Sequence, residues 1–207
     1  ERDSLWAGLR ASRERKSARG ACLVGGAGSG KTRLTEWLRH RVIETGSARV
    51  FSVTHNPMAP PGEALARLVV EASHCGGLGC DAGSARMERL LRREGVTARY
   101  EWEALTAVMA VAEGWSTDEL VTFERPQDRY VVIARFLHRC AKREPLLLVF
   151  DDVHYGADTM SFVEFLLDDP DAQGHPIFVV MTARTDLLQG RSGERVRLDQ
   201  LAARSEV

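Results

Sequence analysis

An eight-residue stretch near the N-terminus limits the possible folds more than any other part of the chain. Residues 25–32 read Gly-Gly-Ala-Gly-Ser-Gly-Lys-Thr and match the pattern G-x-x-x-x-G-K-[ST] throughout. A short apolar run, residues 21–24, precedes this stretch, and residues 30–43 follow it with apolar side chains at helical spacing. A buried strand, a glycine-rich loop and a helix in this order are typical of a phosphate-binding loop in a parallel α/β sheet.

Each residue type in the loop has a chemical reason to be there. Glycines let successive backbone N–H groups turn toward phosphate oxygens, and the helix that follows directs its partial positive charge to the same point. Lys31 adds a full charge between the β- and γ-phosphates, and the Thr32 hydroxyl is placed to ligate Mg²⁺. The residues predicted to bind the nucleotide are Gly25, Gly26, Ala27, Gly28, Ser29, Gly30, Lys31, Thr32 and Arg33.

Two other interpretations of the loop fit less well. A glycine-rich turn with a chance lysine would not need the strand and helix that flank it. A dinucleotide-binding turn would need a third glycine where Lys31 stands. It would also need an acidic residue after the next strand, whereas that run ends in Val53 and Thr54.

An acidic pair at the end of a later apolar run predicts the second half of the site. Residues 146–150 are all apolar, as in a central parallel strand covered on both faces, and Asp151 and Asp152 follow. The carboxyl end of such a strand borders the crevice in which ligands bind in open α/β sheets. We predict that Asp151 holds Mg²⁺, directly or through water, and that Asp152 orients or deprotonates the attacking water. Alternatively, Asp152 only caps the turn that follows.

The next apolar run, residues 177–181, ends in Thr182, Ala183 and Arg184. If this strand neighbours the strand of the phosphate loop, its end lies beside the γ-phosphate. Thr182 or Arg184 could then detect that phosphate, and a guanidinium suits three charged oxygens. Arg184 is therefore a candidate catalytic residue beside Lys31 and Asp152, and the alternative is an arginine exposed on a loop.

The rest of the chain alternates between short apolar runs and segments with helical periodicity. Strands are predicted at residues 21–24, 48–54, 146–150 and 177–181, with a last edge strand at 196–198. Helices are predicted at residues 3–17, 30–43, 62–73, 84–94, 102–113, 127–142 and 158–167. This alternation favours a parallel α/β sheet with right-handed crossovers. Residues 74–120 show no recognisable chemistry.

Composition argues against several classes of partner. The 28 basic and 29 acidic residues give a formal charge of −1, so no bulk field draws the chain to nucleic acid or to a membrane. No apolar run approaches the length of a membrane-spanning helix. The four cysteines, at positions 22, 75, 80 and 140, match no zinc pattern and are too sparse for a disulfide framework. We therefore expect a reducing, cytoplasmic compartment.

The basic residues are nearly all arginines, since only Lys16, Lys31 and Lys142 are lysines among the 28. This bias decides nothing about function by itself. Arg10, Arg13 and Arg19 belong to a basic cluster near the end of the first predicted helix. A solvated helix face with cations near its C-terminus is favoured there over contact with nucleic acid.

Taken together, the phosphate loop, the sequence Asp-Asp-Val-His-Tyr at residues 151–155, and Arg184 resemble the signal-transduction ATPases with numerous domains. These form the STAND class of AAA+-like P-loop NTPases, found in bacterial LuxR/MalT-type regulators and beside serine/threonine kinase or adenylate cyclase domains. The resemblance spans nearly the whole chain. Residues 1–5 are similar to the family's opening motif with its first residues cut away, and residues 199–201 to the motif that closes the ATPase core. Tyr155 stands where the family usually has tryptophan.

The resemblance implies an α/β fold of the three-layer P-loop NTPase (ASCE) type, with helices on both faces of a five-stranded parallel sheet in the order 5-1-4-3-2. It implies a single ATPase core over residues 1–207, with a helical insert at roughly 62–125, cut from a larger protein and without the winged-helix region. The implied function is a switch that binds ATP or ADP with Mg²⁺ and hydrolyses ATP slowly. Its expected partners are neighbouring domains and further copies of the chain, and the related enzymes complete their site with an arginine from a neighbour. Arg125, Arg129 and Arg135 are unranked candidates for that arginine.

Other functions remain possible for the same core. A DNA-associated ATPase of the replication initiator or loader type is the main alternative, although the charge of −1 argues against direct DNA binding by this chain. An interaction module with a decayed ATP site would not need to retain Lys31, Thr32, Asp151 and Asp152. A kinase for small molecules would need an arginine-rich lid, which only residues 74–120 could contain.

Overall fold

The structure is a computed structural model of the chain, and it describes residues 1–188 and 191–203. The chain divides into two compact units, one formed by Glu1–Pro57 and Cys140–Val207 and the other by Met58–Arg139. The first unit contains the sheet and the second is helical. The helical insert expected at roughly 62–125 falls within the second unit.

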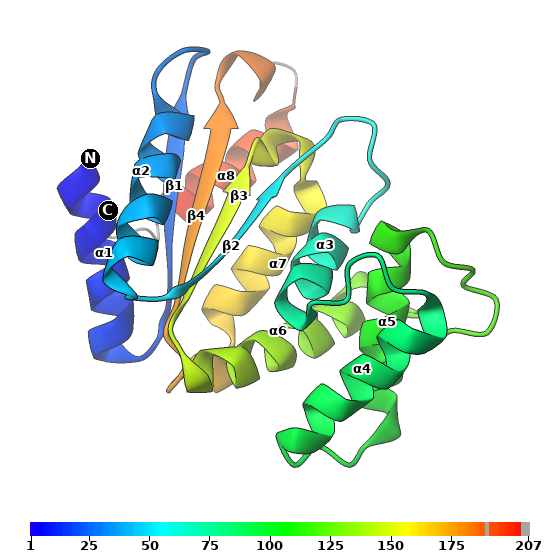
Figure 1. Cartoon of the computed structure of the whole chain (residues 1–207). Coiled ribbons are helices and arrows are strands. Elements are labelled where there is room, and N and C mark those ends of the chain that lie inside the picture. The colour runs from blue at the N-terminus through cyan, green and yellow to red at the C-terminus, as the bar shows by residue number, and fades with distance from the viewer. Residues whose placement is uncertain (189–190, 204–207) are drawn as a thin grey trace. The chain divides into compact units, whose positions relative to one another are not determined.

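The sheet of the first unit is parallel throughout its described part (Figure 1). Its strands are β1 (Ala18–Gly25), β2 (Arg49–Thr54), β3 (Leu146–Asp151) and β4 (Ile177–Arg184), in the order β1-β4-β3-β2. The central strands are buried along their length except for their last residues, Asp151 and Arg184. Burial on both faces explains why these two strands are unbroken apolar runs in the sequence.

The fifth strand expected at residues 196–198 is wrong. These residues lie inside α8 (Ser192–Ala203), and the expected order 5-1-4-3-2 is replaced by 1-4-3-2 in the part of the chain that the structure describes. Leu198 and Leu201, three positions apart, are the buried residues of this helix. A Val-Arg-Leu segment fits either one turn of a helix or a short strand, so local periodicity cannot decide between them. Packing of α8 beside β1 decides for the helix.

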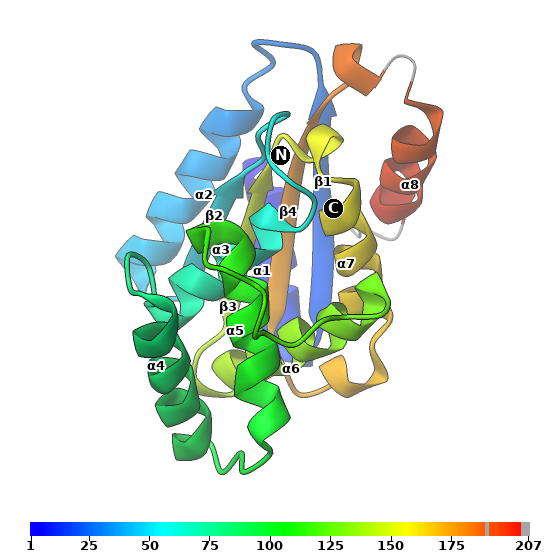
Figure 2. The same cartoon turned by 90° about the vertical axis from the view of Figure 1, so that its right-hand side faces the viewer.

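Helices cover both faces of the sheet, as expected. α1 (Arg2–Arg15) and α2 (Lys31–Thr45) pack on one face. α7 (Ala157–Asp168) lies across the sheet from α2 (Figure 2). The core under α1 and α2 contains Leu5, Leu9, Leu38, Val42, Leu147, Val149, Phe178 and Val180. The even spacing along β3 and β4 shows that alternate residues of each strand face these helices.

In the described part of the first unit there are three short 3₁₀ helices, η1 (Val153–Tyr155), η2 (Pro170–Ala172) and η3 (Asp186–Leu188). The second unit contains α3 (Glu63–Ser73), α4 (Cys80–Arg93), α5 (Arg99–Glu113) and most of α6 (Pro126–Arg143). Within it, Glu101 on α5 accepts hydrogen bonds from Arg135 at 3.1 Å and Arg139 at 3.0 Å. Arg135, a candidate for the contributed arginine, is therefore engaged by a nearly buried carboxylate of its own chain.

Candidate nucleotide site

The predicted phosphate loop lies between the end of β1 and the first turn of α2. Gly28 and Gly30 have φ angles of +74° and +88°, which L side chains rarely adopt. A side chain at Gly25 would collide with Ser29, whose Oγ lies 2.8 Å from the position of an added Cβ. At Gly26, by contrast, an added Cβ would meet nothing within 4 Å. Some of these glycines are therefore needed for the backbone conformation, and the space beside Gly26 is open.

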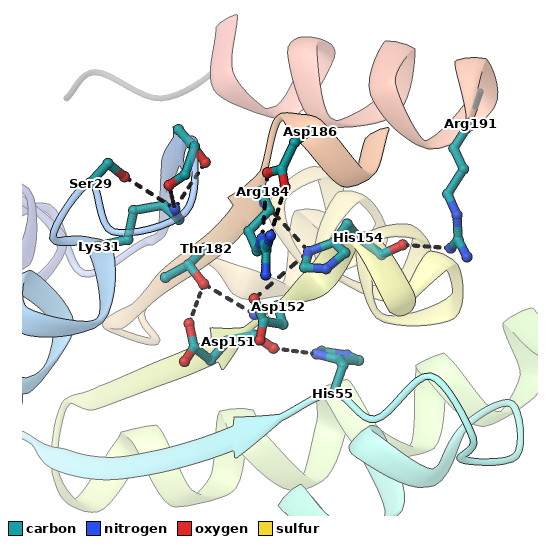
Figure 3. A network of polar contacts seen from close by, with 12 residues as sticks. Ser29, Lys31, His55, Asp151, Asp152, His154, Thr182, Arg184, Asp186 and Arg191 are labelled. Atoms are coloured by element: carbon teal, nitrogen blue, oxygen red, sulfur yellow. Dashed lines mark hydrogen bonds and ion pairs between the residues drawn. The ribbon is translucent and has the colours of Figure 1, made fainter. Parts of the chain in front are cut away.

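Lys31 folds over the mouth of this loop (Figure 3). Its ammonium donates hydrogen bonds to the backbone oxygens of Gly25 at 2.9 Å and Gly26 at 2.8 Å, and to Ser29 Oγ at 3.1 Å. The first turn of α2 contains no acidic residue, and its N-cap, Gly30, makes no side-chain capping bond. The positive end of the helix dipole therefore adds to the lysine charge, and the loop favours an anion.

The register of the sheet brings the acidic strand end to the same edge as the loop. Gly25 is the partner of Arg184 across β1 and β4, Leu23 is the partner of Thr182, and β3 lies on the other side of β4. With strands about 4.8 Å apart, the end of β3 lies about 10 Å across the sheet from the start of the loop. Lys31, Asp151 and Arg184 therefore lie along one edge of the sheet (Figure 3).

Thr182 links the two aspartates. Its hydroxyl donates to Asp151 Oδ1 and accepts the backbone N–H of Asp152 at 3.1 Å. The sequence suggested Thr182 as a detector of the γ-phosphate, whereas its side chain in the structure holds the end of β3. The sequence indicated only that Thr182 lies near the end of an apolar strand. Its contact with Asp151 depends on the pairing register of β3 and β4.

Asp152 occupies an unusual backbone conformation. It lies in the left-handed region at φ 56° and ψ 42°, which costs a residue with a side chain ~1–3 kcal/mol. It stands at the N-cap position of η1, yet its side chain makes no capping hydrogen bond. The side-chain capping bond that the alternative interpretation requires is therefore not made. Its carboxylate is about one-third exposed and lies 3.8 Å from the ring Nδ1 of His154.

His154 is buried behind the acids and links them to the segments after β4. Its Nδ1 accepts the backbone N–H of Arg184 at 3.4 Å, which requires that nitrogen to be unprotonated. Burial lowers the pKa of His154, the nearby Asp152 opposes that effect, and the charges of Arg184, Arg191 and His55 add to the lowering. Arg191, just before α8, donates to the His154 backbone oxygen at 2.9 Å.

His55, directly after β2, contacts Asp151 and was not identified from the sequence. Its backbone N–H and ring Nδ1 both donate to the backbone oxygen of Asp151, at 3.0 and 2.8 Å, and its Nε2 accepts from the Thr159 hydroxyl at 2.9 Å. A Cβ at Gly156 would collide with this ring, so a larger residue there would displace it. The position of His55 directly after β2, at the carboxyl edge of the sheet, was the only sequence signal.

The remaining predicted residues are present but less engaged. Thr32 and Arg33 are exposed on the first turn of α2. The Arg184 guanidinium pairs with Asp186 at 2.6 Å, and the hydrogen bond from Arg184 lowers the pKa of that carboxyl. Contact of Arg184 with a phosphate therefore requires its side chain to leave Asp186, and this role stays a prediction.

The oxygen donors at this edge fit Mg²⁺ that is held jointly with a phosphate. Magnesium bound to nucleotides usually takes one or two carboxylates together with phosphate oxygens and water. Thr32 and Asp151 offer this kind of donor set. Within the described residues no group of three or more His, Cys, Asp or Glu is placed to hold a metal ion by itself. None of the four cysteines, all of which the structure describes, forms a disulfide.

A phosphate loop after the first strand of a parallel sheet, with acids after a central strand, defines a P-loop nucleotide-binding domain. Residues 1–180 match the family model of the AAA ATPase domain, and the chain belongs to that family. The match includes the loop and both aspartates but ends before Thr182 and Arg184. No curated protein matches the chain. Among the described residues, no helix has the length and apolar character needed to cross a membrane.

His154 predicts a specific dependence of stability on pH. The pKa of His154 in the folded state is below the ordinary 6.5. Just below pH 6.5, this histidine therefore binds a proton more readily in the unfolded chain than in the folded chain. Stability is therefore lost as the pH falls below 6.5, with a slope of at most about 1.4 kcal/mol per pH unit for one proton. Urea unfolding between pH 7.5 and 5.5 should show a shallower loss for His154→Gln than for the wild type. The exposed His40→Gln should retain the wild-type slope, and equal slopes in all three proteins would contradict the prediction.

Proposed function

We propose that this domain binds ATP with Mg²⁺, hydrolyses it slowly and acts as a nucleotide-dependent switch. In this proposal it belongs to a larger bacterial signalling or transcription-regulatory protein of the cytoplasm, like the signal-transduction ATPases that it resembles. The observation that carries the switch is the hydrogen bond from Arg191 to the His154 backbone oxygen, because it links the segment directly after Asp151 and Asp152 to the segment that enters α8.

Binding depends on the loop and on Lys31. The backbone N–H groups of residues 26–32 and the start of α2 receive the phosphates, and the Lys31 ammonium moves from the loop carbonyls to the phosphate oxygens. The flexible Lys31 side chain can reach both the loop carbonyls and the bound phosphate. When the ammonium moves, hydrogen bonds to neutral carbonyl oxygens are replaced by hydrogen bonds to charged phosphate oxygens. Hydrogen bonds to charged groups are the stronger kind.

Hydrolysis depends on the acidic pair. Thr32 and Asp151 would hold Mg²⁺, which when bound neutralises charge on the phosphate oxygens. Asp152 accepts a proton from the attacking water, and its partial exposure leaves room for that water. Thr182 fixes the backbone of Asp152, which has the left-handed conformation, by accepting its N–H. The pairing of Arg184 with Asp186 must open before the guanidinium can assist.

The switch requires different affinities for ATP and ADP. A ligand shifts a conformational equilibrium only by its differential affinity for the two states, and the γ-phosphate is the part of ATP that ADP lacks. We expect calorimetric titrations in Mg²⁺ to give micromolar dissociation constants for both nucleotides, differing by about tenfold, or about 1.4 kcal/mol. Equal constants would contradict the switch but leave an ATPase, and failure of both nucleotides to bind would contradict the proposed function.

The alternative is a DNA-associated ATPase of the initiator or loader type. It would use the same loop and acids, and the basic residues near the end of α1 would contact DNA. The formal charge of −1 gives no general attraction to a polyanion. A gel shift with duplex DNA separates the two functions, because a loader should bind with a steep dependence on salt.

A further inference from the structure

The basic cluster near the end of α1 lies at the end of the sheet opposite the phosphate loop. A cavity of about 540 Å³ opens there, beside the starts of β1, β3 and β4. Its basic lining side chains are Arg10, Arg13, Lys16, Lys142 and Arg143, and two acids, Glu14 and Glu144, share the rim. All of these residues belong to the first unit. β1 separates this basic cavity from the phosphate loop by eight residues, or about 26 Å.

The backbone around the basic cavity is fixed by hydrogen bonds. Lys16 ends α1 in the left-handed conformation, at φ 49° and ψ 53°, and its oxygen accepts the N–H of Gly174 at 2.7 Å. Pro145 and Pro176 are joined across the starts of their strands, since Leu146 N donates to Pro176 O at 2.9 Å. The last turn of α6, which carries Lys142, leads directly into this pair. The basic side chains are therefore attached to backbone segments that hydrogen bonds already hold in place.

Much of the positive charge in the basic cavity is not neutralised locally. Arg10 forms an exposed ion pair with Glu14 at 3.5 Å. Arg13, Lys16 and Lys142 form no ion pair with any of the described residues. Five basic and two acidic side chains leave an excess of positive charge around a concave space. Like charges held together in this way repel, and an anion relieves that repulsion.

The distribution of lysines points to the same place. Only three of the 28 basic residues are lysines, and two of them line this cavity while the third belongs to the phosphate loop. Both cation types bind phosphate, the ammonium as a compact point charge and the guanidinium through paired hydrogen bonds.

A plainer explanation accounts for only part of the arrangement. Basic residues in the last turn of a helix stabilise its dipole, and both α1 and α6 end with them. That effect needs one or two cations at each helix end. Stabilising the helix dipoles does not require the ends of α1 and α6 to meet at one cavity. Nor does it require the hydrogen bond that joins Lys16 to the loop before β4.

We propose that the basic cavity binds a small, multiply charged phosphate compound, independently of the phosphate loop. Its volume lies in the range typical of small-molecule sites. None of its lining residues is aromatic, so it offers no platform for stacking nucleic-acid bases. The ligand is therefore recognised by its phosphate groups, and its binding would neutralise the basic side chains near the ends of α1 and α6.

Inorganic tripolyphosphate is the probe that tests the proposal. Titrations are made in the Lys31→Ala background, so that the phosphate loop does not contribute and the outcome does not depend on ATP binding. We expect one tripolyphosphate per chain in this background. Lys16→Ala/Lys142→Ala should lower the affinity at least about tenfold, because two charge-assisted contacts are lost. The milder Lys16→Gln/Lys142→Gln preserves side-chain bulk and should show the same loss.

A charge-matched control separates this site from general electrostatics. Arg41→Ala/Arg99→Ala removes two positive charges from exposed positions elsewhere and should retain the affinity within about twofold. Thermal unfolding without ligand confirms that each variant is folded. Absence of binding in the Lys31→Ala background, or equal loss in the control, would overturn the proposal. Displacement of tripolyphosphate by a short duplex DNA with a steep salt dependence would instead assign the surface to nucleic acid and would also overturn it.

Discussion

Lys31→Ala is expected to lower the affinity of the domain for ATP at least about 100-fold. The ammonium is the only full positive charge that the loop places over the phosphates, and its loss removes hydrogen bonds to charged oxygens worth about 1.5–3 kcal/mol each. A factor of 100 corresponds to about 2.7 kcal/mol. The alanine also removes three hydrogen bonds that hold the loop itself. Calorimetric titration with ATP in Mg²⁺ measures the change directly.

The matched control for this variant lies on the same helix. Arg41→Ala also removes one positive charge from α2, but from an exposed side chain beyond the first turn. Its ATP affinity should stay within about twofold of the wild type, since exposed charges more than a Debye length away are largely screened. Unchanged ATP affinity in Lys31→Ala would remove the assignment of residues 25–32 as the phosphate site.

Asp152→Asn is expected to slow ATP hydrolysis by about 100- to 10,000-fold, the usual contribution of a general base. The amide cannot accept the proton of the attacking water. Asparagine tolerates the left-handed conformation as well as aspartate does, so the backbone at this position should not change. ATP affinity should therefore change only a few-fold. Single-turnover phosphate release measures the rate, and calorimetry measures the affinity.

Two comparisons make the Asp152 result specific. Asp81→Asn, an exposed substitution at the start of α4, should hydrolyse ATP at the wild-type rate. A parallel fall of affinity and rate in Asp152→Asn would indicate a disturbed loop rather than a lost base. Wild-type hydrolysis by Asp152→Asn would rule out Asp152 as the base.

The supporting contacts explain why the acids are expected to act as a unit. The Thr182 hydroxyl donates to the carboxylate of Asp151 and accepts the backbone N–H of Asp152. His55 holds Asp151 from the other neighbouring strand. An acid fixed by both of its neighbouring strands loses little freedom when a ligand arrives, which is the usual condition for catalytic groups.

Much of the site was predictable from the sequence because its signals are local. The phosphate loop needs glycines at fixed spacing, and the acids need an apolar strand directly before them. Residues 25–32 and 151–152 could therefore be recognised from their immediate sequence neighbours. The predicted helices of the chain were found with ends shifted by a few residues, because amphipathic periodicity is also local.

Only the tertiary structure decided the rest. Whether residues 196–198 form a strand depends on packing beside β1, and Thr182 meets Asp151 only through the register of β3 and β4. His55 joins the site from a strand that is distant in sequence, and the basic cavity forms where the ends of α1 and α6 meet. Local sequence sets periodicity and turn chemistry, whereas contacts between distant segments depend on how the sheet is assembled.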